Sequence, residues 1–203
     1  SAVNHTAYVG LHLKAIATGS AGMGILAGGA GTDRLFEDLL IEGFQVGLFI
    51  ESSLAITNVR IRRCTVVDQW SPFGGHSQGV LANNIDGFLF EECIFDHCGW
   101  KEPNVVAPGH PGQAPTLFNH NFYLYGGNRN VTIRQCLVTR ASSNGISDNC
   151  SGLVEDNLVL RNPLGIFVRT QGTTVRGNVI MEGTDIDVGQ NILRGYGIII
   201  GQQ

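Results

Sequence analysis

The chain carries little charge, no basic cluster and no long apolar run. Only 15% of its 203 residues are charged, and the formal net charge is −4. Because proteins that bind nucleic acids neutralise phosphates with clustered Lys and Arg, this composition argues against a nucleic-acid partner. No apolar stretch approaches the length of a membrane span, so we also expect no membrane partner.

Helical periodicity and a disulfide framework are also missing. No window offers ten or more residues with apolar side chains at a 3.6-residue period, so we expect almost no helix. The five cysteines do not resemble the framework of a small secreted domain. Cys64, Cys93 and Cys136 instead occupy one position of a repeated pattern, where Cys behaves as a small hydrophobic side chain. A disulfide or metal role is the alternative, and the sequence offers no pairing for Cys98 and Cys150.

The repeated pattern is an apolar residue, two mostly polar residues, Cys or Asn, and two mostly apolar residues. Its copies begin at Ile61, Phe90, Ile133, Val154 and Val175, with a diverged copy at Phe36. A second element, usually Gly followed by alternating inward and outward side chains, begins at Gly24, Gly47, Gly79, Asn121, Gly145, Gly165 and Gly197. Self-similarity at this period is typical of a solenoid of short strands. We therefore predict an all-β chain that forms one domain over residues 1–203, a parallel β-helix of about seven coils.

The chain resembles the right-handed parallel β-helix superfamily that includes pectate lyases. In that family a stacked Asn or small residue marks the bend between the second and third strands of each coil. The residues that match this bend are Cys64, Cys93, Cys136, Asn157 and Asn178. The resemblance implies a carbohydrate-active protein outside the cell or on its surface, of bacterial or phage-like type. It also implies a substrate groove along the first sheet, walled by the turns that precede its strands.

Those turns differ greatly in length. They are long at 68–78, 97–120 and 181–196 and short at 139–144 and 161–164, whereas the turns that follow the Gly-led strands are all short. Insertions on one side of a repeat array usually mark the functional side. We therefore expect a trough with raised walls. Both ends of the sequence lack a polar cap, so we expect that a longer solenoid, a homo-oligomer or end-to-end stacking covers them.

Outward positions of the Gly-led strands form the predicted floor of this trough. The candidates for sugar binding are Tyr125, Asn149, Arg169 and Phe167, together with Trp100 from the middle long turn. Aromatic rings can stack on the apolar faces of sugars, although the same residues can instead pack beneath the long turns. Asp148 falls at an inward position that is apolar in the other coils. We expect either a bulge that turns it outward or a hydrogen-bond network that holds it.

Lyases of acidic polysaccharides must neutralise a uronate carboxylate, remove the C5 proton and protonate the leaving oxygen. The middle long turn and the strand after it supply the catalytic candidates Asp96, His97, Lys101, His120 and Tyr123. The two histidines and Lys101 are candidate bases, Tyr123 is a candidate acid, and Arg169 is a candidate carboxylate clamp. We expect His97, His120 and Tyr123 to converge at the trough floor.

Other chemistries stay open. Asp96 and Asp148 form a candidate hydrolase pair, although the sequence does not define their separation. Asp185 and Asp187, in the last long turn, form a tight acidic pair that could contribute to a calcium site, and calcium is the one possible cofactor. His76, Asp96, His97, His110 and His120 form a metal-ligand set without the usual tight spacing. The leading prediction is a polysaccharide lyase or related glycoside hydrolase, and the alternatives are a glycan-binding or adhesion module and a structural segment of a spike or fibre.

Overall fold

The computed structural model describes residues 2–16, 22–103, 112–187 and 194–201. All named elements in these residues are β-strands, which confirms for them the expected lack of helix. Accordingly, this part of the chain contains no helix of the length and apolar character needed to cross a bilayer.

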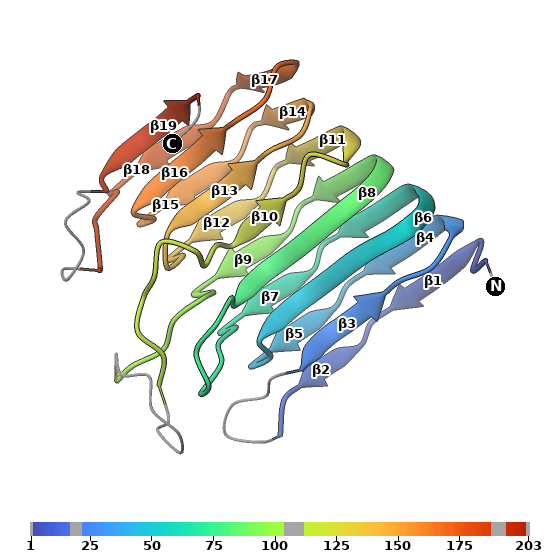
Figure 1. Ribbon diagram of the computed structural model, residues 1–203, viewed down its shortest axis with the longest axis horizontal. Coiled ribbons are helices and arrows are strands. Elements are labelled where there is room, and N and C mark those ends of the chain that lie inside the picture. Colours follow the sequence, from blue (N-terminus) through green and yellow to red (C-terminus); the bar gives the residue numbers. More distant parts are fainter. Residues whose placement is uncertain (1, 17–21, 104–111, 188–193, 202–203) are drawn as a thin grey trace.

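Each coil contains three strands, and equivalent strands of successive coils stack in parallel (Figure 1). The first face consists of β3 (Met23–Ala27), the first parts of β6 (Val46–Arg62) and β8 (Gln78–Glu91), β10 (Phe122–Leu124), β13 (Asn144–Asp148), β16 (Leu164–Val168) and β19 (Tyr196–Ile200). The second face consists of β1 (Thr6–Val9), β4 (Gly31–Glu37), the second parts of β6 and β8, β11 (Arg129–Arg134), β14 (Gly152–Glu155) and β17 (Thr173–Arg176). The third face is a sheet of β2 (His12–Lys14), β5 (Leu40–Glu42), β7 (Thr65–Val67), β9 (Ile94–Asp96), β12 (Leu137–Thr139), β15 (Leu158–Leu160) and β18 (Val179–Met181).

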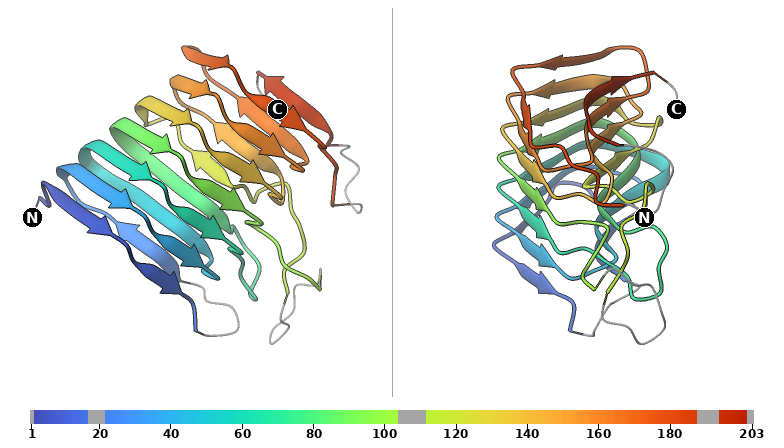
Figure 2. Two further views of the ribbon diagram at one scale, coloured as in Figure 1. Left: turned by 180° about the vertical axis from the view of Figure 1, so that it is seen from behind. Right: turned by 90° about the vertical axis from the view of Figure 1, so that its left-hand side faces the viewer.

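Figure 2 shows the coils stacked one above another, from the N-terminal coil to the C-terminal coil. Long strands β6 and β8 run through the bend between the first and second faces, so these faces belong to one 12-stranded sheet. The register on the first face aligns Leu124 of β10 with Asp148 of β13 and Val168 of β16. The predicted parallel β-helix, with seven strands on its first face in the described residues, is confirmed.

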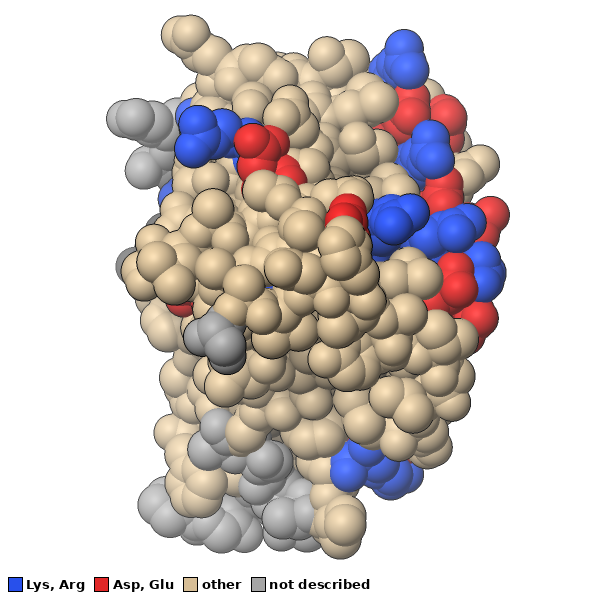
Figure 3. Space-filling model, turned by 90° about the vertical axis from the view of Figure 1, so that its right-hand side faces the viewer, with Lys and Arg blue, Asp and Glu red and all other residues tan. Residues whose placement is uncertain are grey.

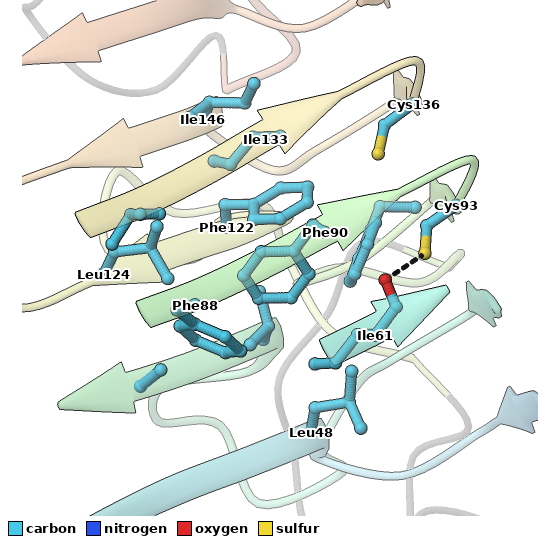
Figure 4. Packing of buried hydrophobic residues seen from close by; sticks show 14 of the residues in the cluster. Leu48, Ile61, Phe88, Phe90, Cys93, Phe122, Leu124, Ile133, Cys136 and Ile146 are labelled. Atoms are coloured by element: carbon cyan, nitrogen blue, oxygen red, sulfur yellow. Dashed lines mark hydrogen bonds between the residues drawn. The ribbon is translucent and has the colours of Figure 1, made fainter. Parts of the chain in front are cut away.

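The interior is filled by inward side chains that stack from coil to coil. Figure 4 shows Phe88, Phe90 and Phe122 at its centre. The ring centroids of Phe88 and Phe90 are 4.3 Å apart, and those of Phe90 and Phe122 are 5.0 Å apart in an edge-on arrangement. Full burial of each such side chain stabilises the fold by roughly 1.5–3 kcal/mol. Alternation of inward and outward residues therefore produces a continuous core that no coil could form alone.

The bend into the third face is held by a ladder of Cys and Asn side chains. Cys64, Cys93 and Cys136 are free and buried, so the predicted thiol ladder is confirmed, and Cys98 and Cys150 are also free and buried. Cys93 donates from Sγ to the Ile61 carbonyl at 3.4 Å, as the dashed line in Figure 4 marks. The adjacent Cys136 thiol, together with burial, raises the pKa of Cys93 to about 12. In the later coils Asn157 donates to the Ile133 carbonyl at 3.0 Å and accepts from the Cys136 amide at 2.9 Å.

Charged residues on the second face pair along the solenoid axis. Arg62 donates to Glu37 at 3.2 Å and to Glu91 at 2.7 Å, and Arg134 also donates to Glu91. In Figure 3 acidic and basic side chains lie side by side along one edge, while the rest of that face is mostly uncharged. Because most of these ion pairs are partly exposed, each adds little to stability.

Asp148 points into the interior without a bulge, in register with its apolar neighbours, and is 2% exposed. Its Oδ1 accepts from the amide of Cys150 at 3.1 Å and from its thiol at 2.9 Å, and its Oδ2 accepts from Thr173 at 2.8 Å. Burial raises the pKa of the Asp148 carboxyl, and these hydrogen bonds oppose that rise. Of the two expectations, the hydrogen-bond network is therefore the one that the structure adopts.

Candidate functional site

The long turns project from one edge of the coil stack, where the third face leads into the first (Figure 1). A cavity of about 190 Å³ lies against the first face at β10, β13 and β16. Its polar lining comes from all three long turns, from the short turn before β13 and from the face itself: His76, His120, Tyr123, Ser143, Asn144, Arg169 and Arg194. The uneven turns therefore gather at one site, as their lengths predicted.

Two long turns are tied together beside this cavity. The amide side chain of Gln78 donates to the Phe118 carbonyl at 2.8 Å and accepts from the His120 amide at 2.7 Å. The Ser77 amide donates to Asn119 Oδ1 at 3.0 Å. These buried contacts join residues about forty positions apart, so segment 112–121 is held against the start of β8.

Ser142, in the short turn before β13, is where the second and third long turns meet. Its hydroxyl accepts from the Thr116 amide at 2.6 Å and donates to the Thr116 carbonyl at 2.8 Å. Its carbonyl accepts from Arg194 Nη1 at 3.3 Å. The short turn before β13 therefore contacts both the second and the third long turn.

His120 is buried and is held as a neutral ring. Its Nδ1 accepts a hydrogen bond from the Asn144 amide at 3.1 Å, which assigns the ring proton to Nε2. Burial lowers the pKa of His120 to about 3, and the charges of Arg169, His76 and Arg194 add to the effect. His120 is therefore a hydrogen-bond donor to the cavity near neutral pH and is poorly suited to act as a base.

Two tyrosines and an arginine lie at outward positions of the first face, near His120. The rings of His120 and Tyr123 are 5.1 Å apart, and those of Tyr123 and Tyr125 are 4.7 Å apart. Burial and the neighbouring Tyr123 raise the pKa of Tyr125. The Arg169 guanidinium lies 4.5 Å from the Phe167 ring centroid and has no hydrogen bond or ion pair to another described residue. Its N–H groups are thus free to bind an anion.

Asn149 lies between Tyr125 and Arg169, because the three residues follow aligned positions of β10, β13 and β16. Its Oδ1 is buried and has no hydrogen-bond partner among the described residues, and Asn149 does not line the cavity. Phe167 is fully buried, so its ring has no face free for a sugar in this structure. Phe167 is therefore a packing residue, as the alternative prediction stated, and not a sugar-stacking residue.

Arg194 is the site residue that sequence reasoning missed. Its side chain is 3% exposed and donates to Asp185 at 2.7 Å, with Asp187 at 3.5 Å. Burial favours a raised pKa for Asp185, but the hydrogen bond from Arg194 leaves it lowered overall. The acidic pair proposed for calcium is thus engaged by an arginine. Arg194 Nε has no partner, which leaves one more buried N–H in the cavity wall.

The remaining catalytic candidates lie elsewhere, at the end of β9. His97 Nδ1 is 2.7 Å from Asp68 Oδ1, and Arg140 donates to both carboxylate oxygens of Asp96. Lys101 Nζ lies 4.3 Å from the Trp70 ring centroid. None of the candidates Asp96, His97, Trp100 and Lys101 lines the cavity. The expected convergence of His97 with His120 and Tyr123 is therefore wrong.

The structure does not support the hydrolase pair or the metal-ligand set. Asp148 points into the core while Asp96 is paired with Arg140, so they do not form a hydrolase pair across one cleft. Within the described residues no group of three His, Cys, Asp or Glu side chains is arranged to hold a metal ion. His110, the remaining member of the proposed ligand set, lies outside the described residues.

Fold and site together define a solenoid with a polar cavity on one face, under uneven turns. A family model described as a right handed beta helix region matches residues 15–180, so the chain belongs to the right-handed β-helix family. No curated protein and no solved structure shows significant similarity to the chain.

Proposed function

We propose that this protein binds an acidic polysaccharide in the first-face cavity and cleaves it by β-elimination. The observation that carries the proposal is a set of two donors in the cavity without a balancing carboxylate, the Arg169 guanidinium and the Nε2–H group of His120. A carboxylate ligand would supply the negative charge that this set lacks. Such polymers occur outside cells and on their surfaces, and we infer that location for the protein.

The proposed reaction assigns each step to a cavity residue. Arg169 and His120 hold the uronate carboxylate, which stabilises negative charge as the C5 proton leaves. His76 accepts that proton, the electron pair forms the C4–C5 double bond, and the C4–O bond breaks. Tyr123 protonates the leaving oxygen. Atoms and charge balance without water or an oxidant.

The test measures the ultraviolet absorbance of the unsaturated product on a panel of uronate polymers. We expect Tyr123→Phe to lower kcat by about 10²-fold or more, because a general acid typically contributes 10²–10⁴-fold. Tyr125→Phe is the matched control, since its ring contacts that of Tyr123 but has no assigned proton transfer. Wild-type protein that binds these polymers without forming product would indicate a glycan-binding module instead. Equal activity of the two variants would remove Tyr123 from the mechanism.

A further inference from the structure

A second hollow, separate from the first-face cavity, lies at the ends of β12, β15 and β18. Its volume is about 330 Å³, and it is lined by Trp100, Arg140, Arg161, Glu182, Thr184 and Ile186. None of these residues lines the first-face cavity. Trp100 comes from the middle long turn, whereas Thr184 and Ile186 come from the last one.

The floor of this hollow is built by the repeat itself. His97, Arg140, Arg161 and Glu182 each follow a third-face strand directly, and all have φ between 50° and 57°. Equivalent positions in successive coils lie about 4.8 Å apart. The two arginines are therefore neighbours along the axis.

Trp100 is held in a defined orientation at one wall. Its Nε1 donates to the Arg140 carbonyl at 2.9 Å. The His97 ring packs edge-on against it, with centroids 4.4 Å apart and planes at 89°, and Asp68 holds His97 in turn. The Asp68–His97 pair thus supports the indole. Because the indole N–H is already bonded, the part of Trp100 that faces the hollow acts through its ring surface.

The charges around the hollow are balanced. Arg140 pairs with Asp96 at 2.5 Å, and Arg161 pairs with Glu182 at 2.6 Å. Each arginine retains N–H groups with no partner among the described residues. The site therefore offers an aromatic surface beside hydroxyl-binding groups, without the unbalanced positive charge of the first-face cavity.

We propose that this hollow is a second carbohydrate-binding site, which takes an uncharged sugar ring by stacking on Trp100. The ring face covers the indole while its hydroxyls bond to Arg140, Arg161 and Glu182. This binding does not depend on the reaction assigned to the first-face cavity.

Tryptophan fluorescence tests the proposal directly. The chain has two tryptophans, and Trp70 is only 4% exposed, so a ligand-dependent change reports mainly on Trp100. The probes are neutral gluco-, galacto-, manno- and xylo-oligosaccharides, compared with uronate oligosaccharides. We expect at least one neutral series to shift the emission. Absence of a response to every neutral series would overturn the proposal.

Variants then locate the binding by retardation in gels that contain the responding polymer. We expect Trp100→Ala to weaken binding by about tenfold, as loss of a central aromatic contact usually does. Phe73→Ala is the control, because Phe73 is 69% exposed and lies outside the hollow. If Trp100→Ala lowers the thermal midpoint, Arg161→Ala replaces it, since this side chain is 65% exposed. Unchanged binding in the folded variant would overturn the proposal.

The two sites fail separately. Tyr123→Phe should keep the fluorescence response, and Trp100→Ala should keep cleavage of short uronate substrates. If Trp100→Ala loses both the binding of neutral sugars and the cleavage of uronate substrates, the hollow and the cavity act as one site, and the proposal of a separate site is overturned. If the wild-type protein shows the fluorescence response to neutral oligosaccharides but does not cleave uronate polymers, the result contradicts only the proposed reaction.

Discussion

At the residue scale, the neutral state of His120 has a measurable consequence for stability. The folded protein holds its pKa at about 3, whereas an unfolded histidine titrates near 6.5. Between these values the unfolded state binds the proton more readily. Stability is therefore lost as the pH falls from 6.5 toward 3.

We expect this loss to disappear in His120→Gln, whose side-chain carbonyl can still accept from the Asn144 amide. The slope difference should be roughly 1.4 kcal/mol per pH unit below 6.5. It is measured by denaturant unfolding of both proteins across that pH range. His5→Gln is the control, because His5 is 75% exposed at the side chain. Parallel curves for wild type and His120→Gln would contradict the buried neutral ring.

At the scale of the element, the bend ladder explains why the repeat accepts either Cys or Asn. Asn157 satisfies the Cys136 amide and the Ile133 carbonyl, both at a buried bend. Cys93 serves the Ile61 carbonyl from the equivalent position. Each residue is small and can donate to the carbonyl of the preceding coil, and that requirement defines the position.

Asn157→Ala should therefore destabilise the protein by about 2–4 kcal/mol, since it leaves two buried backbone groups unpaired. Asn157→Cys, which introduces the residue of the preceding coil, should cost clearly less. Denaturant unfolding at one pH measures both. Equal losses would mean that side-chain volume, and not hydrogen bonding, determines the bend.

At the scale of the whole molecule, the core is continuous through the middle coils. All five cysteines are buried, and together they span residues 64–150. Burial raises the pKa of the Cys98 thiol, so both access and thiolate formation are suppressed there.

We therefore expect no thiol to react promptly with an aromatic disulfide reagent in the native protein. All five should become reactive together as denaturant unfolds the chain. The measurement compares the released thiolate with the circular dichroism of the sheet. Prompt reaction of one or two thiols without loss of sheet signal would show that the coils open independently.

The same scale separates what could be predicted from what could not. Strand faces and inward side chains followed from local alternation, and the bend position followed from the resemblance to the parallel β-helix superfamily. The orientation of Asp148 did not, because its partner Thr173 lies 25 residues away in the next coil. The outward positions of Tyr123 and Arg169 could be predicted, because side chains in a strand alternate with a period of two residues.

By itself, the sequence determined the solenoid, the faces of its strands and the side on which the long turns lie. These depend on periodic alternation, and each coil repeats the same local choice. Only the tertiary structure decided which side chains of the long turns meet. His97 contacts Asp68 and Trp100, whereas His120 lines the cavity. Arg194 donates to the carbonyl of Ser142, which is 52 residues away in the sequence. Turns without a period follow paths set by contacts between distant segments, and no local pattern encodes those contacts.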